Sequence, residues 1–145
     1  MRFPKVMAAL FASILTAVCM PVILPLFDEP GAYFANVLIY ALYTSPVIYS
    51  YGIAASKLSE FLSGKYHKRF SKFFSFLYHI SFGFLFGIPY FLLVDNLIFS
   101  EGLLNYISII GMVAGAIYFL VNEVVMYIYH RQGAALMREN GEELI

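Results

Sequence analysis

The chain has 145 residues, of which 61% are hydrophobic and 12% charged, whereas an average soluble domain carries roughly 25% charged residues. Nine Lys and Arg balance nine Asp and Glu, so the sequence lacks the sustained basic surface that nucleic-acid binding requires. The single cysteine, Cys19, excludes an intramolecular disulfide and a cysteine-based zinc site. The composition therefore indicates an integral membrane protein, in which the placement of charge is more informative than its sum.

Four apolar runs are long enough to cross a bilayer, whose core needs about 20 apolar residues in a helix. They predict an all-α bundle of four transmembrane helices that forms one membrane domain over residues 1–145. The runs cover residues 6–27, 33–55, 73–94 and 103–129. The fourth run is the longest, and we expect it to tilt or to protrude from the bilayer. We expect residues 130–145 to form a tail that extends this helix and frays.

The basic residues predict the orientation, because connectors rich in Lys and Arg stay in the cytoplasm. The connectors at 28–32 and 95–102 contain acidic residues but no Lys or Arg, whereas the connector at 57–72 contains five basic residues. With four spans, all nine basic residues fall on one side. We therefore predict a multi-pass protein of the cell membrane with both termini and the tail in the cytoplasm.

The first run could instead be a signal peptide, with MRFPK as its basic region. Its apolar stretch is longer than a usual signal core, and its end, CMPVILPLF, contains no small-x-small cleavage site. A lipoprotein modification at Cys19 would need a small residue where Val18 stands. We therefore expect the first helix to remain uncleaved.

Glycines predict a close contact between the third and fourth helices, since small residues let backbones approach each other in lipid. Each of these runs contains one Gly-x-x-x-Gly pattern, formed by Gly83 and Gly87 and by Gly111 and Gly115. Counted from the connector, the two patterns lie at the same depth. We expect an antiparallel hairpin in which Gly87 meets Gly111 and Gly83 meets Gly115. The alternative is that each glycine packs against another helix or another copy of the chain.

Polar side chains recur about one third of the way into the spans from the cytoplasmic side. Glu123 is the only acidic residue well inside a run, and the residues at similar depth are His79, Tyr49, Ser50 and Ser13. Angular spacing places Asn122, rather than Glu123, on the glycine face towards the third helix. The predicted register places position 119 opposite His79, which leaves Glu123 two candidate partners, His79 and Lys72.

An ionisable residue inside a span is a functional-site hypothesis by default, here a proton or cation site at Glu123. The structural alternative, which we favour, is that Glu123 reaches the cytoplasmic interface or makes one hydrogen bond. Pro46, beside Thr44 and Ser45, predicts a kink near the middle of the second span. Such a kink serves either a gate or, as we favour, the shape of the bundle.

Basic and aromatic residues alternate in the inner connector, where the basic residues nearest the third span are Lys65, Lys68, Arg69 and Lys72. Anionic lipid head groups attract such residues by about 1 kcal/mol per charge, so we expect a contact with the inner leaflet. The same residues are also the ordinary orientation signal. The segment KLSEFL, at the start of this connector, either continues the second helix or forms a short interfacial helix.

Catalytic signatures are absent: the sequence contains no Gly-x-Ser-x-Gly, no His-Glu-x-x-His and no P-loop. The three histidines are too scattered to propose a metal site. The acidic residues of the outer connectors match no calcium-loop spacing, and we interpret them as solvated charges. We expect no enzymatic activity, no cofactor and no metal.

Three segments, ILPLFDEP, YSYGIAASKLSEFLSGK and LYHISFGFLFGIPYF, resemble small four-span membrane proteins of Gram-positive, Bacillus-type bacteria. That group has no established activity, so the resemblance implies a fold and a membrane location but no mechanism. Two functions stay open. The first is a non-enzymatic accessory, immunity or envelope factor that acts through helix–helix contacts with another membrane protein or a second copy. The second is a small proton-coupled transporter or efflux element that uses Glu123.

Overall fold

The computed structural model describes residues 3–139, and within this range every regular element is a helix. Four helical stretches are long and apolar enough to cross a membrane: Pro4–Ile23, Tyr33–Tyr66, Lys68–Leu93 and Tyr106–Ala134. The prediction of an all-α fold with four such helices is confirmed. Of the expected tail, residues 130–139 belong to the last helix, and residues 140–145 lie outside the described range, as does Arg2.

Helix α1 comprises Pro4–Ile23 and ends earlier than the first apolar run. A proline in the first turn suits a helix start, because its missing N–H would have no helical partner there. At the other end, Leu24 leaves the helical conformation (φ −139°, ψ 81°) directly before Pro25. The ring of a proline disfavours the helical conformation of the residue before it, which explains this end point.

The second membrane-length helix is one continuous rod of 34 residues, Tyr33–Tyr66. It consists of α2 (Tyr33–Val47), the π-helical turn η1 (Ile48–Gly52) and α3 (Ile53–Tyr66). The π-turn follows Pro46, and the Ser50 hydroxyl donates a hydrogen bond of 2.7 Å to the Pro46 carbonyl. Because η1 keeps the rod continuous, the KLSEFL segment continues the helix and does not form a separate interfacial one.

The third membrane-length helix contains the 3₁₀ turn η2 (Lys68–Phe70), α4 (Ser71–Leu85) and α5 (Gly87–Leu93). α4 and α5 meet at Phe86, because Pro89 has no N–H to donate to the carbonyl of Leu85. A connection with the 3₁₀ turn η3 (Ile98–Glu101) leads to α6 (Tyr106–Glu139). α6 therefore starts three residues after the beginning of the fourth apolar run.

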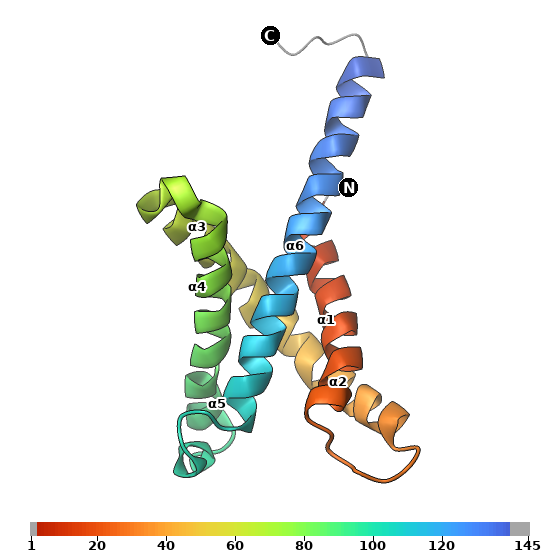
Figure 1. The fold of residues 1–145 in the computed structure, drawn as a ribbon, viewed down its shortest axis with the longest axis vertical. Helices are drawn as coiled ribbons and strands as arrows, with labels where there is room; N and C mark the ends of the chain where they lie inside the picture. The colour runs from red at the N-terminus through yellow and green to blue at the C-terminus, as the bar shows by residue number, and fades with distance from the viewer. Residues whose placement is uncertain (1–2, 140–145) are drawn as a thin grey trace.

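The second rod crosses the molecule, so that α2 packs on α1 while α3 packs on α4 (Figure 1). α6 lies between α4 and α1 and contacts both. The start of α1, the α3–α4 turn and the end of α6 lie at one end of the molecule. We call this the basic end, because it contains Lys5, Lys65, Lys68, Arg69 and Lys72. The opposite end, which contains Asp28, Glu29 and Asp95, is the acidic end.

Small side chains form the face of α1 that contacts its neighbours. Ala8, Ala9 and Ala12 are fully buried, and Tyr118 and Val125 of α6 pack in the same cluster. Lipid tails are as apolar as these side chains, so close van der Waals packing, rather than exclusion of water, stabilises such a contact in a membrane. The alanine face of α1 thus explains how α1 and α6 come close together.

Glycines form the closest contact between α4 and α6. A Cβ added at Gly83 would overlap the carbonyl oxygen of Gly111, and one added at Gly111 would overlap that of Gly83. α4 and α6 therefore form a hairpin in which glycine meets glycine, at a pair other than those predicted. The predicted pairs Gly87–Gly111 and Gly83–Gly115 are wrong, because Gly115 faces the His79 backbone, and Gly87 faces Ser108 and Phe99.

The α4–α6 register is therefore shifted by one helical turn from the predicted one. Each residue of α4 lies opposite an α6 residue four positions earlier in the chain than expected, so that His79 lies level with Gly115 and not with Phe119. Phe99, in η3, contacts Gly87 and takes the room that Gly111 was expected to fill. The shift also brings Lys72 level with Asn122 and Glu123.

Candidate functional site

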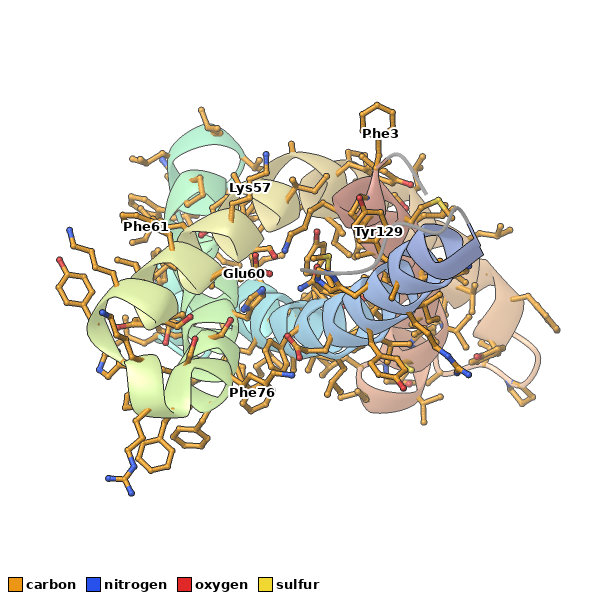
Figure 2. The ribbon with its side chains drawn as sticks, turned by 90° about the horizontal axis from the view of Figure 1, so that it is seen from above. Phe3, Lys57, Glu60, Phe61, Phe76 and Tyr129 are labelled. Carbon is orange, nitrogen blue, oxygen red and sulfur yellow. The ribbon has the colours of Figure 1, made fainter. Side chains whose placement is uncertain are left out.

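A cluster of polar side chains joins three helices at the basic end. The ammonium group of Lys5 (α1) forms an ion pair with the Glu60 carboxylate (α3) and donates hydrogen bonds to Ser56 Oγ at 3.1 Å and to Asn122 Oδ1 at 3.0 Å. The side-chain amide of Asn122 (α6) donates to Glu60 Oε1 at 2.9 Å. Figure 2 shows Glu60 on the side of α3 that faces α6, with Lys57 on the opposite side. We call these four residues the Lys5–Glu60 cluster.

The Lys5–Glu60 cluster differs from an exposed ion pair in that Asn122 is buried and Lys5 mostly so, while the Glu60 carboxylate that joins them is partly exposed. The Lys5 side chain is 18% exposed and that of Glu60 41% exposed, while Asn122 is only 2% exposed. A charge that leaves water needs a partner and further hydrogen bonds, or its desolvation outweighs the attraction. Here each charged group has its counter-charge and the Asn122 amide, which donates to the carboxylate and accepts from the ammonium. The cluster is neutral as a whole, and its contacts hold α1, α3 and α6 together.

Sequence reasoning missed this cluster. The sequence pattern places Glu60 in a connector and predicts for Lys5 only a contribution to orientation. A usable signal was present, because Ser56, Ser59 and Ser63 are all buried at spacings of three and four residues. Small polar residues at that spacing mark one face of a helix that packs on a neighbour. They predict both the continuation of the rod and the face that carries Glu60.

The predicted contact of Asn122 with the third helix is wrong, because its side chain bonds to Lys5 and Glu60 on α1 and α3. That contact would require α4 to stay beside α6 over its whole length. α6 crosses α4 and the two diverge towards the basic end (Figure 1). The face of α6 that meets α4 at Gly115 therefore meets α1 and α3 about two turns later, at Asn122.

Glu123 lies apart from the Lys5–Glu60 cluster. Its carboxylate forms a salt bridge with the Lys72 ammonium group, with 2.8 Å between Lys72 Nζ and Glu123 Oε2. Of the two candidate partners, Lys72 and His79, Glu123 therefore pairs with Lys72. The Lys72 side chain is 84% exposed and that of Glu123 38% exposed. Measured in water, an exposed pair of this kind contributes about 0–1 kcal/mol. The Lys72–Glu123 pair thus differs from the Lys5–Glu60 pair in its lysine, which is exposed in the first and mostly buried in the second.

The predicted polar layer does not assemble. Tyr49 and Ser50 lie on the exposed side of the rod, and the Ser50 hydroxyl bonds within its own helix. Ser13 is buried, but its hydroxyl donates to the Ala9 carbonyl at 2.8 Å on the same helix. Equal depth along four helices does not place side chains on facing surfaces, because each helix also has its own rotation.

The basic residues of the α3–α4 turn are exposed and lie over aromatic rings. The Lys65 ammonium is 5.3 Å from the ring centroid of Tyr66, and the Arg69 guanidinium is 5.7 Å from that of Phe70. Lys68 and Lys72 are also exposed. Rings that sit beside cations in this way are typical of an interface where one side is apolar and the other wet.

A groove of about 700 Å³ opens between the second rod, α4–α5 and α6. We call it the apolar groove, because its 23 lining residues include eight Phe and Tyr but no Asp, Glu, Lys or Arg. Several of its hydroxyl groups are engaged in the fold. Tyr40 donates to the Leu24 carbonyl at 2.6 Å and is hydrogen-bonded to the Tyr106 hydroxyl, and Tyr51 donates to the Phe82 carbonyl at 2.8 Å.

His79 lines this groove and is 3% exposed. Its Nδ1 lies 2.7 Å from the carbonyl oxygen of Ser75, which can only accept, so Nδ1 carries a proton. Tyr118 stacks against the imidazole with ring centroids 6.1 Å apart. The other ring nitrogen, Nε2, is buried and has no hydrogen-bond partner among the described residues. A buried polar atom without a partner is uncommon and calls for an explanation.

Within residues 3–139, no group of three His, Cys, Asp or Glu side chains lies close enough to hold a metal ion. Comparison with family models, with curated proteins and with solved structures finds no significant match for this chain. The features of the described residues that bear on function are the Lys5–Glu60 cluster, the Lys72–Glu123 pair and the apolar groove.

Proposed function

We propose that this chain is a non-enzymatic, multi-pass protein of the cell membrane that acts through contacts with other membrane components. One observation carries the proposal: the charged side chains between the helices are satisfied by one another. Lys5, Glu60 and Asn122 bond to each other across α1, α3 and α6, which is the arrangement of a structural clasp. A carrier for protons or ions would need such groups free to change partner.

The surfaces left for function are apolar. Large hydrophobic side chains on every long helix are exposed, among them Ile14, Leu38, Leu92 and Leu120. In a membrane such surfaces meet lipid or other helices, and the apolar groove adds a concave site of the size typical for small-molecule ligands. These surfaces support a role as an accessory, immunity or envelope factor that contacts lipid or other helices.

The proposed orientation places the basic end in the cytoplasm, with both termini on that side. Its support is the positive-inside rule, because five basic residues lie in α3, the α3–α4 turn and the start of α4, and the connectors at the acidic end contain no Lys or Arg. The exposed residues Lys65, Lys68, Arg69 and Lys72 are then available to anionic head groups of the inner leaflet.

Reporter fusions test the orientation. A fluorescent protein that matures only in the cytoplasm should be bright when fused at the C-terminus or inserted at Gly64, and dark when inserted at Gly31. Alkaline phosphatase, which is active only outside the cytoplasm, should show the reverse pattern. Bright fluorescence from the Gly31 insertion would reject the proposed orientation.

A small proton-coupled transporter that uses Glu123 is the competing proposal. We expect proteoliposomes with an imposed pH gradient to show the same proton flux as empty liposomes, for the wild type and for Glu123→Gln alike. Glu123→Gln should change the free energy of unfolding by no more than about 1 kcal/mol, because its pair with Lys72 is exposed. Proton flux by the wild type that a folded Glu123→Gln protein loses would overturn the non-enzymatic contact role in favour of transport.

A further inference from the structure

An open pocket of about 410 Å³ lies between α4 and α6, near the basic end of the molecule. The Lys72–Glu123 salt bridge forms one part of its lining, and the rest is apolar. The apolar lining residues are Phe73, Phe76, Phe119 and Leu120. We call this site the Lys72–Glu123 pocket. It is separate from the apolar groove, with which it shares no lining residue.

The charged and apolar parts of the Lys72–Glu123 pocket lie at different depths. α4 runs away from the basic end, whereas α6 runs towards it (Figure 1). Phe76 therefore lies about one helical turn further from the basic end than Lys72, and Phe119 about one turn further than Glu123. The rings of Phe76 and Phe119 meet across the two helices, with centroids 5.3 Å apart. The salt bridge thus lies on the basic side of an aromatic layer, which is the order of head group and hydrocarbon in a phospholipid.

Helix length places the salt bridge at the border of the hydrocarbon core. The helix from Lys72 to Leu93 is about 32 Å long, and the core of a bilayer is about 30 Å thick. Leu93 lies close to Asp95 of the acidic end, which marks one border of the core. Lys72 therefore reaches the opposite border, where the lipid head groups begin.

Both charged groups of the salt bridge can bind further partners. Both side chains reach the surface, and within residues 3–139 neither makes a hydrogen bond beyond their mutual contact. An ammonium group has three N–H donors and a carboxylate accepts on two oxygens, so most of this capacity is unused. A ligand with one negative charge would pair with Lys72 but would be repelled by Glu123. A ligand with one negative and one positive charge pairs with both, because its dipole can lie antiparallel to that of the salt bridge.

We propose that the Lys72–Glu123 pocket binds a zwitterionic phospholipid with a primary ammonium group, that is, one of the phosphatidylethanolamine type. Its phosphate pairs with Lys72, and its ammonium group donates to the Glu123 carboxylate. An acyl chain lies against the deeper residues Phe76, Phe119 and Leu120. The proposal rests on the contact role described above and names one membrane component contacted. Phosphatidylcholine carries the same two charges, but its trimethylated ammonium group has no N–H to donate to Glu123.

Photolabelling in lipid nanodiscs tests the site with two probes that differ only in the head group. One is phosphatidylethanolamine and the other phosphatidylcholine, each with a diazirine at the same place in one acyl chain. We expect the ethanolamine probe to label the pocket residues of α4 and α6 about fivefold more than the choline probe at equal mole fraction, the effect of one partly exposed, charge-assisted hydrogen bond. Equal labelling by the two probes would overturn the proposal.

A phosphatidylglycerol probe distinguishes this site from a general attraction of the basic end for anionic lipid. High salt screens that attraction, and under this condition the glycerol probe should label the pocket no more than the choline probe does. Labelling at or above the level of the ethanolamine probe would assign the pocket to anionic lipid and would also overturn the proposal.

Substitutions at the two charges separate their roles. Glu123→Leu removes the acceptor of the ammonium group and should reduce labelling by the ethanolamine probe to the level of the choline probe. Lys72→Met removes the partner of the phosphate and should reduce labelling by both probes alike, with the preference retained. Lys68→Met is the matched control, because Lys68 is an exposed lysine of the same end that does not line the pocket, and it should change neither.

A preference for the ethanolamine probe that persists in a folded Glu123→Leu protein would reject Glu123 as the acceptor and overturn the proposal. Proton flux by the wild type would refute the contact role but would leave the ratio of labelling by the two probes as it is.

Discussion

Gly83→Ala should lower the free energy of unfolding by about 3 kcal/mol, because the added methyl group overpacks the contact between α4 and α6. The added Cβ would overlap the Gly111 carbonyl oxygen, and a backbone atom cannot turn away as a side chain can. α4 and α6 would have to separate along the hairpin that their glycines close. Unfolding by SDS titration in mixed micelles, followed by circular dichroism, measures the effect.

Gly64→Ala and Gly133→Ala are the matched controls, because an added Cβ at either glycine meets no atom within 4 Å. Both residues lie inside helices, where alanine is favoured over glycine by about 1 kcal/mol, so these variants should be slightly more stable than the wild type. Gly83→Ala combined with Gly111→Ala should cost less than the sum of the single changes, since both open one contact. Wild-type stability of Gly83→Ala would show that α4 and α6 do not touch at this point.

Removal of the Glu60 carboxylate should have the second largest effect. Glu60→Leu leaves the Lys5 ammonium without its counter-charge and Asn122 without one acceptor, and we expect a loss of about 2 kcal/mol in the free energy of unfolding. Asn122→Leu, at a buried position that bonds to both charges, should cost about as much. The same SDS titration measures both variants.

The matched control is Lys57→Met, because Lys57 lies on the opposite, exposed side of α3 (Figure 2). It changes the net charge of α3 by the same amount as Glu60→Leu, with the opposite sign, and should leave the stability within about 0.5 kcal/mol of the wild type. A loss from Lys57→Met as large as that from Glu60→Leu would mean that overall charge, and not the cluster, determines stability.

The four helices could be predicted from the sequence because their apolar runs exceed the thickness of a bilayer, a signal that needs no tertiary information. Their ends could not. The second run appeared to stop where Lys57 begins a polar segment, yet the rod continues to Tyr66 because Ser56, Ser59 and Ser63 face other helices. A membrane helix can thus continue beyond its apolar run where its polar side chains pack against neighbouring helices.

The glycine hairpin could be predicted as a contact but not as a register. A pattern that repeats every four residues still brings one glycine onto another after a slip of one turn, so the sequence does not distinguish the two registers. The observed register keeps Gly83 on Gly111 and gives the place beside Gly87 to Phe99 from the connection. The contact of Phe99 with Gly87 belongs to the connection, and the glycine spacing does not encode it.

The partners of the polar residues could not be predicted from their depth in the apolar runs either. Counting residues from the ends of the apolar runs leaves Glu123 two candidate partners, His79 and Lys72, and in the structure it pairs with Lys72. The same counting overlooked Lys5 and Glu60, which lie outside the apolar runs and meet because the rod crosses behind α6 (Figure 1). The crossing angle of two helices is a property of the whole bundle, and a hydropathy pattern along one chain does not contain it.

Exchange of the two charges between α1 and α3 tests most directly the claim that the polar groups act as a clasp. Lys5→Glu and Glu60→Lys should each destabilise the protein, because each places two like charges beside one another. The double variant restores opposite charges and should recover most of the lost free energy of unfolding. A double variant no more stable than the sum of its single changes predicts would contradict the clasp.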